Sequence, residues 1–284
     1  MVKSVCNFSG GKDSTAMLFG LKDKGIIPDY IIFADTKKEF EEMYEFLDSI
    51  EDQIGRKIIK TEPVHTWKEW FHGVWGKRAK PQYQGKQRGF PMITAPACWH
   101  MRNAKAMPLD RWREKNVGKD TIIYVGLNAD EAERRMDIDH YVVRKKKEIF
   151  VKGDPRFKYP LIEWGWGTKD VIAYCKKINR LNPLYSMFTR LGCWPCPYQS
   201  QRSLYSLWKF FPIKWQELKR MEKESPHGFK IDKTLDEYEI LFRTVDPATL
   251  QDVSTCSLNG DCRPLFGIEP LTKKVCGGRI ELKG

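Results

Sequence analysis

The strongest constraint on the fold is a glycine-containing turn between the first apolar segment and the first helical one. Residues 4–8 have the pattern of a β-strand, Ser9-Gly10-Gly11-Lys12-Asp13-Ser14 follows at once, and residues 14–24 have the pattern of a helix that ends at Gly25. At the carboxyl end of a parallel strand, such a turn directs backbone N–H groups and a helix dipole beyond the sheet, where they favour an anion. The sequence therefore predicts a phosphate-binding loop at Ser9–Ser14.

The residue types in this turn agree with that interpretation. The two glycines let a phosphate approach the backbone closely, and the two serines add hydroxyl donors. Lys12 adds a positive charge, and Asp13 would either carry Mg²⁺ or brace the loop. The spacing differs from that of the nucleotide-triphosphatase loop and from the dinucleotide pattern GxGxxG.

The first half of the chain continues to alternate between strand and helix. Residues 29–36, 57–63 and 121–131 have strand patterns, and residues 39–55 have the pattern of a helix closed by Gly55. Short apolar runs separated by helices are typical of a parallel sheet with helices on both faces. We predict a doubly wound, mostly parallel α/β fold.

The second half of the chain no longer alternates between strand and helix patterns. A segment rich in Pro, Gly and Cys occupies residues 182–200, and residues 203–224 and 234–245 have helical patterns. We predict a nucleotide-binding α/β domain over residues 1–185 and a helical C-terminal region with a C-x-x-C site over residues 186–284.

Charge and hydrophobicity narrow the class of protein. The net charge of +12 and the pI near 9.2 suit a polyanionic partner, although any single basic cluster also fits an ordinary solvated surface. No segment has the roughly 18 continuous apolar residues that a membrane span needs. We expect a cytoplasmic protein without a membrane partner.

The stretch from Trp67 to Arg88 interleaves aromatic and basic side chains. Such a pattern can stack bases and follow phosphates, and it equally fits a lid over a nucleotide or ordinary core aromatics. The aromatic residues are Trp67, Trp70, Phe71, Trp75 and Tyr83, and the basic ones include Lys77, Arg78 and Lys86.

The Ser9–Ser14 turn resembles the SGGxDS loop of the PP-loop ATP pyrophosphatases, the adenine nucleotide alpha-hydrolase superfamily. The segments "IIFADTKKEFEEMYEFL", "YVGLNADEAERR" and "YPLIEWGWGTKDVIAYCKKINRLNPLYSMFTRLGCWPCP" are similar to its PAPS-reductase-like branch, which includes DNA-phosphorothioation ATP pyrophosphatases. Together these segments cover most of residues 1–200.

This resemblance implies the site residues. The loop would grip the pyrophosphate of ATP, with Lys12 and Asp13 taking part in catalysis. Contacts with adenine and ribose would come from Ala34, Asp35 and Thr36. Residues facing the phosphates or the acceptor would be Gly126, Asp130, Glu131 and Arg135, with Arg135 in a catalytic role.

Eight cysteines include a C-x-x-C turn at Cys193 and Cys196. That spacing alone fits a redox pair, a zinc half-site or an iron–sulfur half-site. The resemblance implies a [4Fe–4S] cluster on Cys98, Cys193 and Cys196, with zinc as the alternative metal. The fourth ligand would be Cys262, Cys256 or Cys276, or the fourth iron would stay open, as in the iron–sulfur-dependent tRNA thiolases.

The resemblance also implies the activity. The chain would cleave ATP to AMP and pyrophosphate and adenylate an acceptor for iron–sulfur-dependent sulfur transfer on DNA or tRNA, with a sulfur-donor protein as partner. One alternative is an adenylyl-sulfate or phosphoadenylyl-sulfate reductase that releases sulfite, with Cys276 as nucleophile. A second is a nucleotide-binding module without turnover.

Overall fold

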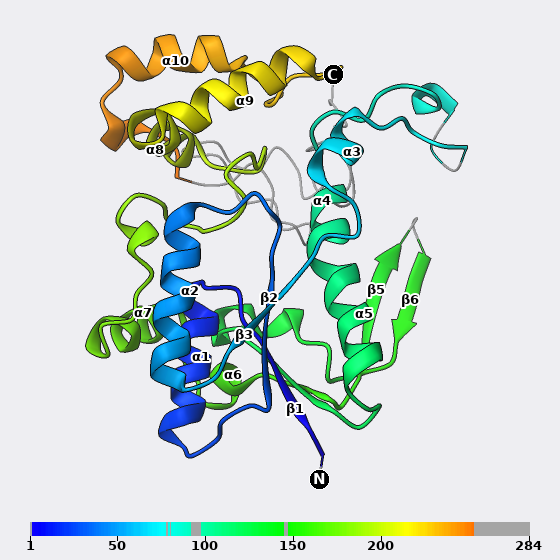
Figure 1. Cartoon of the computed structure of the whole chain (residues 1–284), viewed down its shortest axis with the longest axis vertical. Helices are drawn as coiled ribbons and strands as arrows, with labels where there is room; N and C mark the ends of the chain where they lie inside the picture. The colour runs from blue at the N-terminus through cyan, green and yellow to red at the C-terminus, as the bar shows by residue number, and fades with distance from the viewer. Residues whose placement is uncertain (1, 78, 80, 92–97, 145–146, 253–284) are drawn as a thin grey trace. The chain divides into compact units, whose positions relative to one another are not determined.

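The computed structural model describes residues 2–77, 79, 81–91, 98–144 and 147–252. The chain forms two compact units (Figure 1). Unit 1 comprises Met1–Asp35, Glu41–Thr61 and Pro108–Leu184, and unit 2 comprises Thr36–Phe40, Glu62–Met107 and Tyr185–Gly284. The division into domains at residue 185 stays a prediction.

Unit 1 is built on a five-stranded parallel sheet of order β3-β2-β1-β4-β7. The strands are β1 (Ser4–Asn7), β2 (Tyr30–Ala34), β3 (Ile58–Thr61), β4 (Ile122–Val125) and β7 (Phe157–Lys158). From β1 the chain first adds strands on one side and later adds β4 on the other. The carboxyl ends of β1 and β4 are therefore the point where the strand order reverses, at which open α/β sheets bind ligands.

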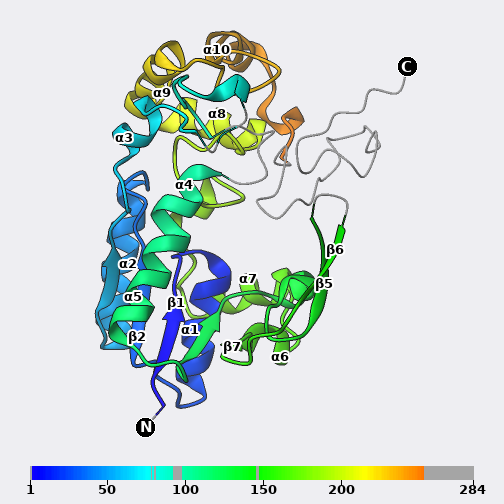
Figure 2. The same cartoon turned by 90° about the vertical axis from the view of Figure 1, so that its right-hand side faces the viewer.

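Helices cover both faces of this sheet. Figures 1 and 2 place α1, α2 and α7 on one face and α5 on the other, where Trp112 of α5 packs edge-on against Tyr30 of β2 with ring centroids 5.2 Å apart. The helices are α1 (Lys12–Asp23), α2 (Glu41–Ile54), α5 (Met107–Asn116), α6 (Pro160–Glu163) and α7 (Thr168–Lys177). The predicted doubly wound α/β class is confirmed.

The predicted helix ends have a backbone explanation. Gly25 and Gly55 follow α1 and α2 with φ of 75° and 70°, the left-handed conformation that ends helices and favours glycine. The antiparallel hairpin of β5 (His140–Arg144) and β6 (Lys147–Val151) was not predicted from the sequence. Short 3₁₀ turns occupy Ala129–Arg134 and Pro183–Ser186.

Unit 2 is helical in its described part. Its helices are α3 (Trp67–His72), α4 (Trp99–Met101), a π-helical turn (Arg102–Ala106), α8 (Gln201–Phe210), α9 (Pro212–Glu224) and α10 (Leu235–Thr244), with 3₁₀ turns at Pro81–Tyr83 and Pro247–Thr249. The single helix expected over residues 203–224 is two helices. Pro212 lacks an N–H and begins α9, which separates it from α8.

Glu239 ties α10 to α9. Its carboxylate accepts hydrogen bonds from Lys219 at 2.8 Å, Arg243 at 2.9 Å and the Trp215 indole at 3.1 Å. These donors, Lys219 first, lower the pKa of Glu239 to about 2.

Two of the five aromatics in the stretch from Trp67 to Arg88 belong to the interior of unit 2, as the core alternative predicts. Trp67 and Phe71 are 9% and 1% exposed, because α3 packs them against other rings. Trp70, Trp75 and Tyr83 are partly exposed. In neither unit do the described residues form a helix long and apolar enough to cross a membrane.

Candidate functional site

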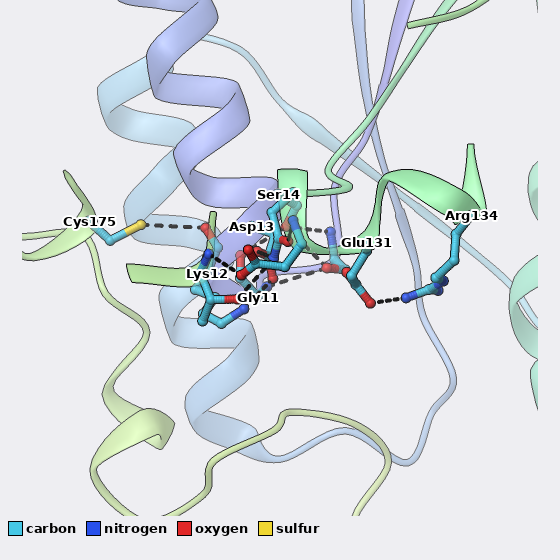
Figure 3. A network of polar contacts seen from close by, with 11 residues as sticks. Gly11, Lys12, Asp13, Ser14, Glu131, Arg134 and Cys175 are labelled. Carbon is cyan, nitrogen blue, oxygen red and sulfur yellow. Dashed lines mark hydrogen bonds and ion pairs between the residues drawn. The ribbon is translucent and has the colours of Figure 1, made fainter. Parts of the chain in front are cut away.

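The Ser9–Ser14 loop lies at the carboxyl end of β1, and its last three residues begin α1. Figure 3 shows its residues from Gly11 to Ser14. Gly11 is the N-cap of α1 and contributes no side-chain cap, so the helix begins without a capping side chain. An uncapped helix start at the switch point of the sheet is a favourable place for an anion.

Internal hydrogen bonds shape the loop. Ser9 donates its backbone N–H to Ser14 Oγ at 3.1 Å, and Ser14 Oγ donates to the carbonyl of Gly11 at 3.0 Å. Gly10 has a φ of 69°, and a Cβ there would collide with Met43 Sδ. Asn182 donates to the carbonyl of Gly10 at 3.1 Å from a buried position. The turn is therefore a preformed structure that requires glycine at position 10.

Lys12 and Asp13 form an ion pair at the start of α1. Lys12 Nζ lies 2.6 Å from Asp13 Oδ2, and both side chains are largely shielded from solvent, at 16% and 22% exposure. Asp13 Oδ1 accepts a hydrogen bond from Asn128 Nδ2 at 2.7 Å. Asp13 thus has one charged and one neutral donor, which fix the direction of its carboxylate.

Asn128 was not among the residues predicted from the sequence. It is 2% exposed and lies after β4, 115 positions from Asp13. The only sign in the sequence was its place in "YVGLNADE", at the end of a strand that a parallel sheet aligns with β1.

Gly126 supports the backbone of the loop. A Cβ on Gly126 would lie 2.8 Å from both the N and Cα atoms of Ser14 and 3.1 Å from the carbonyl carbon of Asp13. No other residue type fits there without displacing the start of α1. The structure thus places this predicted cofactor-binding residue behind the loop as a packing partner.

The charged residues after β4 have partners of their own. Asp130 Oδ2 accepts the backbone N–H of Thr168 at 2.8 Å; this bond, helped by the charge of Lys12, lowers the pKa of Asp130. Glu131 pairs with Arg134 (Figure 3). Arg135 donates Nε to Asp137 at 2.7 Å and also binds its second oxygen. The catalytic role of Arg135 stays a prediction.

The residues expected to contact adenosine are the last residue of β2 and the two residues that follow it. Ala34 is partly exposed, and Asp35 is 2% exposed and accepts a hydrogen bond from Tyr44 at 2.7 Å. Thr36 belongs to unit 2, where it is buried and donates to Glu39 at 2.9 Å. Their contact with a nucleotide stays a prediction.

Unit 2 holds the three described cysteines that were predicted as ligands. Cys193 and Cys196 are partly exposed in one turn, where Cys196 donates its N–H to the carbonyl of Cys193 at 3.2 Å. Cys98 is 8% exposed; burial, and then the charge of Cys196, raise its pKa to about 12. Burial also raises the pKa of Cys193, and Lys105 opposes this shift. The charge of Cys196 thus acts on both Cys98 and Cys193.

The three thiols support one of the two predicted metal groups, the [4Fe–4S] cluster, better than the other, a single zinc ion. Among the residues that the structure describes, no group of three or more His, Cys, Asp or Glu side chains could hold a metal ion, which gives a single zinc no support. A [4Fe–4S] cluster binds each thiolate through a different iron, so its ligands need not meet at one point. The donor chemistry of the three thiols fits such a cluster. Cys256, Cys262 and Cys276 lie outside the described residues.

A family model and a curated relative each match more than half of the chain. The model described as the phosphoadenosine phosphosulfate reductase domain matches residues 3–199. The chain belongs to this family. The expectation of a PAPS-reductase-like chain is thereby confirmed. An uncharacterized protein of Methanocaldococcus jannaschii is 26% identical to this PAPS-reductase-family chain over 225 residues, which are 76% of the chain and 41% of that protein.

Named reductases are also similar. The adenosine 5'-phosphosulfate reductase of Bacillus pumilus is 27% identical over 175 residues, which are 58% of this chain and 61% of that enzyme. The similarity thus spans less than two thirds of the length of either curated relative.

Solved structures resemble this PAPS-reductase-family chain at low identity. The phosphoadenylyl-sulfate reductase of Candida auris has a TM-score of 0.41 at 16% identity, with 67% of this chain and 81% of that chain covered. The U34-tRNA thiolase of Methanococcus maripaludis, solved with its [4Fe-4S] cluster, has a TM-score of 0.37 at 14% identity, with 86% and 73% covered. At these values, neither similarity assigns an activity.

Proposed function

We propose that this chain binds ATP at the Ser9–Ser14 loop and cleaves it to AMP and pyrophosphate, adenylating an acceptor for sulfur transfer. One observation carries the proposal: an uncapped helix start at the switch point of the sheet holds a Lys12–Asp13 pair within a preformed glycine turn. Such an arrangement suits a diphosphate that must be held as it leaves.

The reaction needs charge neutralisation and alignment rather than a covalent catalyst. An oxygen of the acceptor attacks the α-phosphorus of ATP, and the bond to the β-phosphate oxygen breaks. The loop amides and Lys12 hold the leaving pyrophosphate. Sulfur then attacks the acceptor atom, carbon or phosphorus, that carries this oxygen, and AMP leaves together with the oxygen.

Asp13 fits a magnesium ion. Mg²⁺ is usually held by one or two carboxylates together with substrate phosphates, not by a cage made only of protein ligands. A single carboxylate beside a phosphate loop therefore suffices, and the lack of a three-residue ligand group among the described residues does not oppose it. When bound, Mg²⁺ would neutralise charge on the phosphates.

Cys98, Cys193 and Cys196 would hold the [4Fe–4S] cluster of the sulfur-transfer step. When bound, the cluster would supply an iron site for sulfur. This chain's own contribution is to keep the thiols together in unit 2, where Lys105 contributes positive charge near all three. The fourth ligand is proposed to be Cys262, and a sulfur-donor protein is the proposed partner.

A nucleic acid, DNA or tRNA, is the proposed acceptor. The chain carries a net charge of +12, and the Arg88 guanidinium lies 4.4 Å from the centroid of the partly exposed Trp70 ring and 5.6 Å from that of Trp75. Aromatic rings beside cations favour single-stranded bases.

The second candidate is a sulfonucleotide reductase, and the similarity to adenosine 5'-phosphosulfate reductases favours it. In such an enzyme a cysteine thiolate attacks the sulfur of the sulfonucleotide and the adenosine phosphate leaves. A thiol reductant then releases sulfite from the cysteine, so no pyrophosphate is formed. In the proposed reductase, Cys276 would be the nucleophile.

One assay separates the candidates. The full chain is incubated anaerobically with Mg²⁺ and ATP, with and without DNA or tRNA, and AMP and pyrophosphate are measured. Equal amounts of AMP and pyrophosphate support the proposal. If the chain forms no AMP or pyrophosphate from ATP but releases sulfite from adenylyl sulfate with a thiol reductant, the reductase is favoured. Nucleotide binding without any of these products would favour a binding module.

A further inference from the structure

A buried amide on the loop after β4 contacts the phosphate loop. Asn128 uses both ends of its side chain: Nδ2 donates to Asp13 Oδ1 at 2.7 Å and lies 3.4 Å from Thr168 Oγ1, and Oδ1 accepts the N–H of Asp130 at 3.0 Å. At 2% exposure it is held by the surrounding structure. Asn128 therefore links the start of α1 to the start of α7.

The Thr168 end of this link is itself fixed. Asp130 accepts the backbone N–H of Thr168 at 2.8 Å, and a Cβ on the neighbouring Gly167 would lie 2.8 Å from Asp130 Oδ1. The amide plane of Asn128 consequently has little freedom to turn, and its N–H keeps its aim at Asp13.

The two donors to Asp13 have different tasks. Lys12 is the group that we propose binds the phosphates, so on nucleotide binding its ammonium turns from Asp13 to the ligand. Asn128 then remains as a donor. Because it is neutral, it orients the carboxylate without cancelling its negative charge, which leaves that charge available to a cation.

We infer that Asn128 is a positioning residue that holds the Asp13 carboxylate in the direction required by the Mg²⁺–nucleotide complex. The inference rests on the proposed function. Losing a group that orients a metal ligand typically weakens metal affinity about 10- to 100-fold. The Mg²⁺ requirement should therefore change more than the affinity for the nucleotide.

The test compares Asn128→Ala and Asn128→Leu with the wild-type chain and with Asn116→Ala. Asn116 is an exposed asparagine on α5 whose Nδ2 donates to the carbonyl of Trp112 at 2.8 Å, so it serves as the control asparagine. Pyrophosphate release at saturating ATP is measured against Mg²⁺ concentration. Mn²⁺ binding in the presence of ATP is followed by electron paramagnetic resonance, and ATP binding without metal by calorimetry.

We expect the half-saturating Mg²⁺ concentration to rise about 10- to 100-fold in both Asn128 variants. Mn²⁺ affinity should fall by a similar factor, metal-free ATP binding should change less than about threefold, and high Mg²⁺ should restore kcat. Asn128→Leu keeps the side-chain volume and decides the question if the alanine variant does not fold.

Two results would overturn the inference in distinguishable ways. If the wild type releases pyrophosphate and the Asn128 variants lose kcat with an unchanged Mg²⁺ requirement, the residue only supports the fold. If the wild type itself shows no Mg²⁺-dependent pyrophosphate release, the proposed function is wrong, and the inference about Asn128, which rests on it, is wrong as well.

Discussion

Replacing Gly126 with alanine places one methyl group against the backbone of the phosphate loop. The new Cβ would lie 2.8 Å from Ser14 N and Cα and 3.1 Å from the carbonyl carbon of Asp13. All three neighbours are backbone atoms at the start of α1, so no side-chain rotation relieves the contact. Either the loop after β4 or the start of α1 must move.

The cost follows from this geometry. Inserting one methyl group into tightly packed surroundings typically destabilises a fold by about 1–3 kcal/mol. Displacing a reactive group by about 1 Å can lower a rate about 100-fold. We therefore expect Gly126→Ala to reduce pyrophosphate release about 100-fold while lowering the free energy of unfolding by only about 1–3 kcal/mol.

The assay pairs pyrophosphate release with chemical denaturation, and Gly118→Ala is its control. A Cβ on Gly118 would have no atom within 4 Å outside its chain neighbours, so this variant should keep the wild-type rate. A Gly126→Ala variant with wild-type turnover would refute the reasoning, because the loop would then tolerate displacement or would take no part in the reaction.

Three further predictions follow from single contacts. Lys12→Met should lower pyrophosphate release about 100- to 1000-fold in a turnover assay, as loss of a transition-state donor does, and a rate within threefold of wild type would exclude Lys12 from phosphate binding. The pKa of Glu239 is lowered to about 2, chiefly by Lys219, so its carboxylate stabilises the fold above pH ~4.5 and loses this effect as the pH falls towards 2. Glu239→Gln should lower the free energy of unfolding by about 1–2 kcal/mol at pH 7 after allowance for solvent screening, and should weaken its decrease between pH ~4.5 and ~2; an unchanged pH dependence would contradict this. Cys193→Ser should remove iron and acid-labile sulfide from protein purified anaerobically, whereas Cys6→Ala, in the core of β1, should retain both; a colourless wild-type chain that carries no iron would end the cluster hypothesis.

Local patterns predicted the core of unit 1 well. The alternation of strands and helices, with Gly25 and Gly55 at the helix ends, depends on backbone preferences that operate within a few residues. The Ser9–Ser14 turn was recognisable for the same reason, since its glycines and its neighbouring strand are contiguous in the chain.

Contacts between distant segments were beyond such patterns. Asn128 reaches Asp13 only because the parallel pairing of β1 with β4 aligns two strand ends that lie far apart in sequence. The burial of individual side chains could not be predicted either. Trp67 has the same local composition around it as Trp70, yet α3 turns Trp67 into the interior. Side-chain partners such as the Asp137 of Arg135 depend on the path of a loop that no periodicity describes.

The most direct test of the central claim is a crystal structure of the full chain with Mg²⁺ and a non-hydrolysable ATP analogue. The account predicts the β- and γ-phosphates against the backbone amides of Gly10 and Gly11, with Lys12 turned to them and the metal beside Asp13. An analogue bound elsewhere, with the Ser9–Ser14 loop empty, would contradict it.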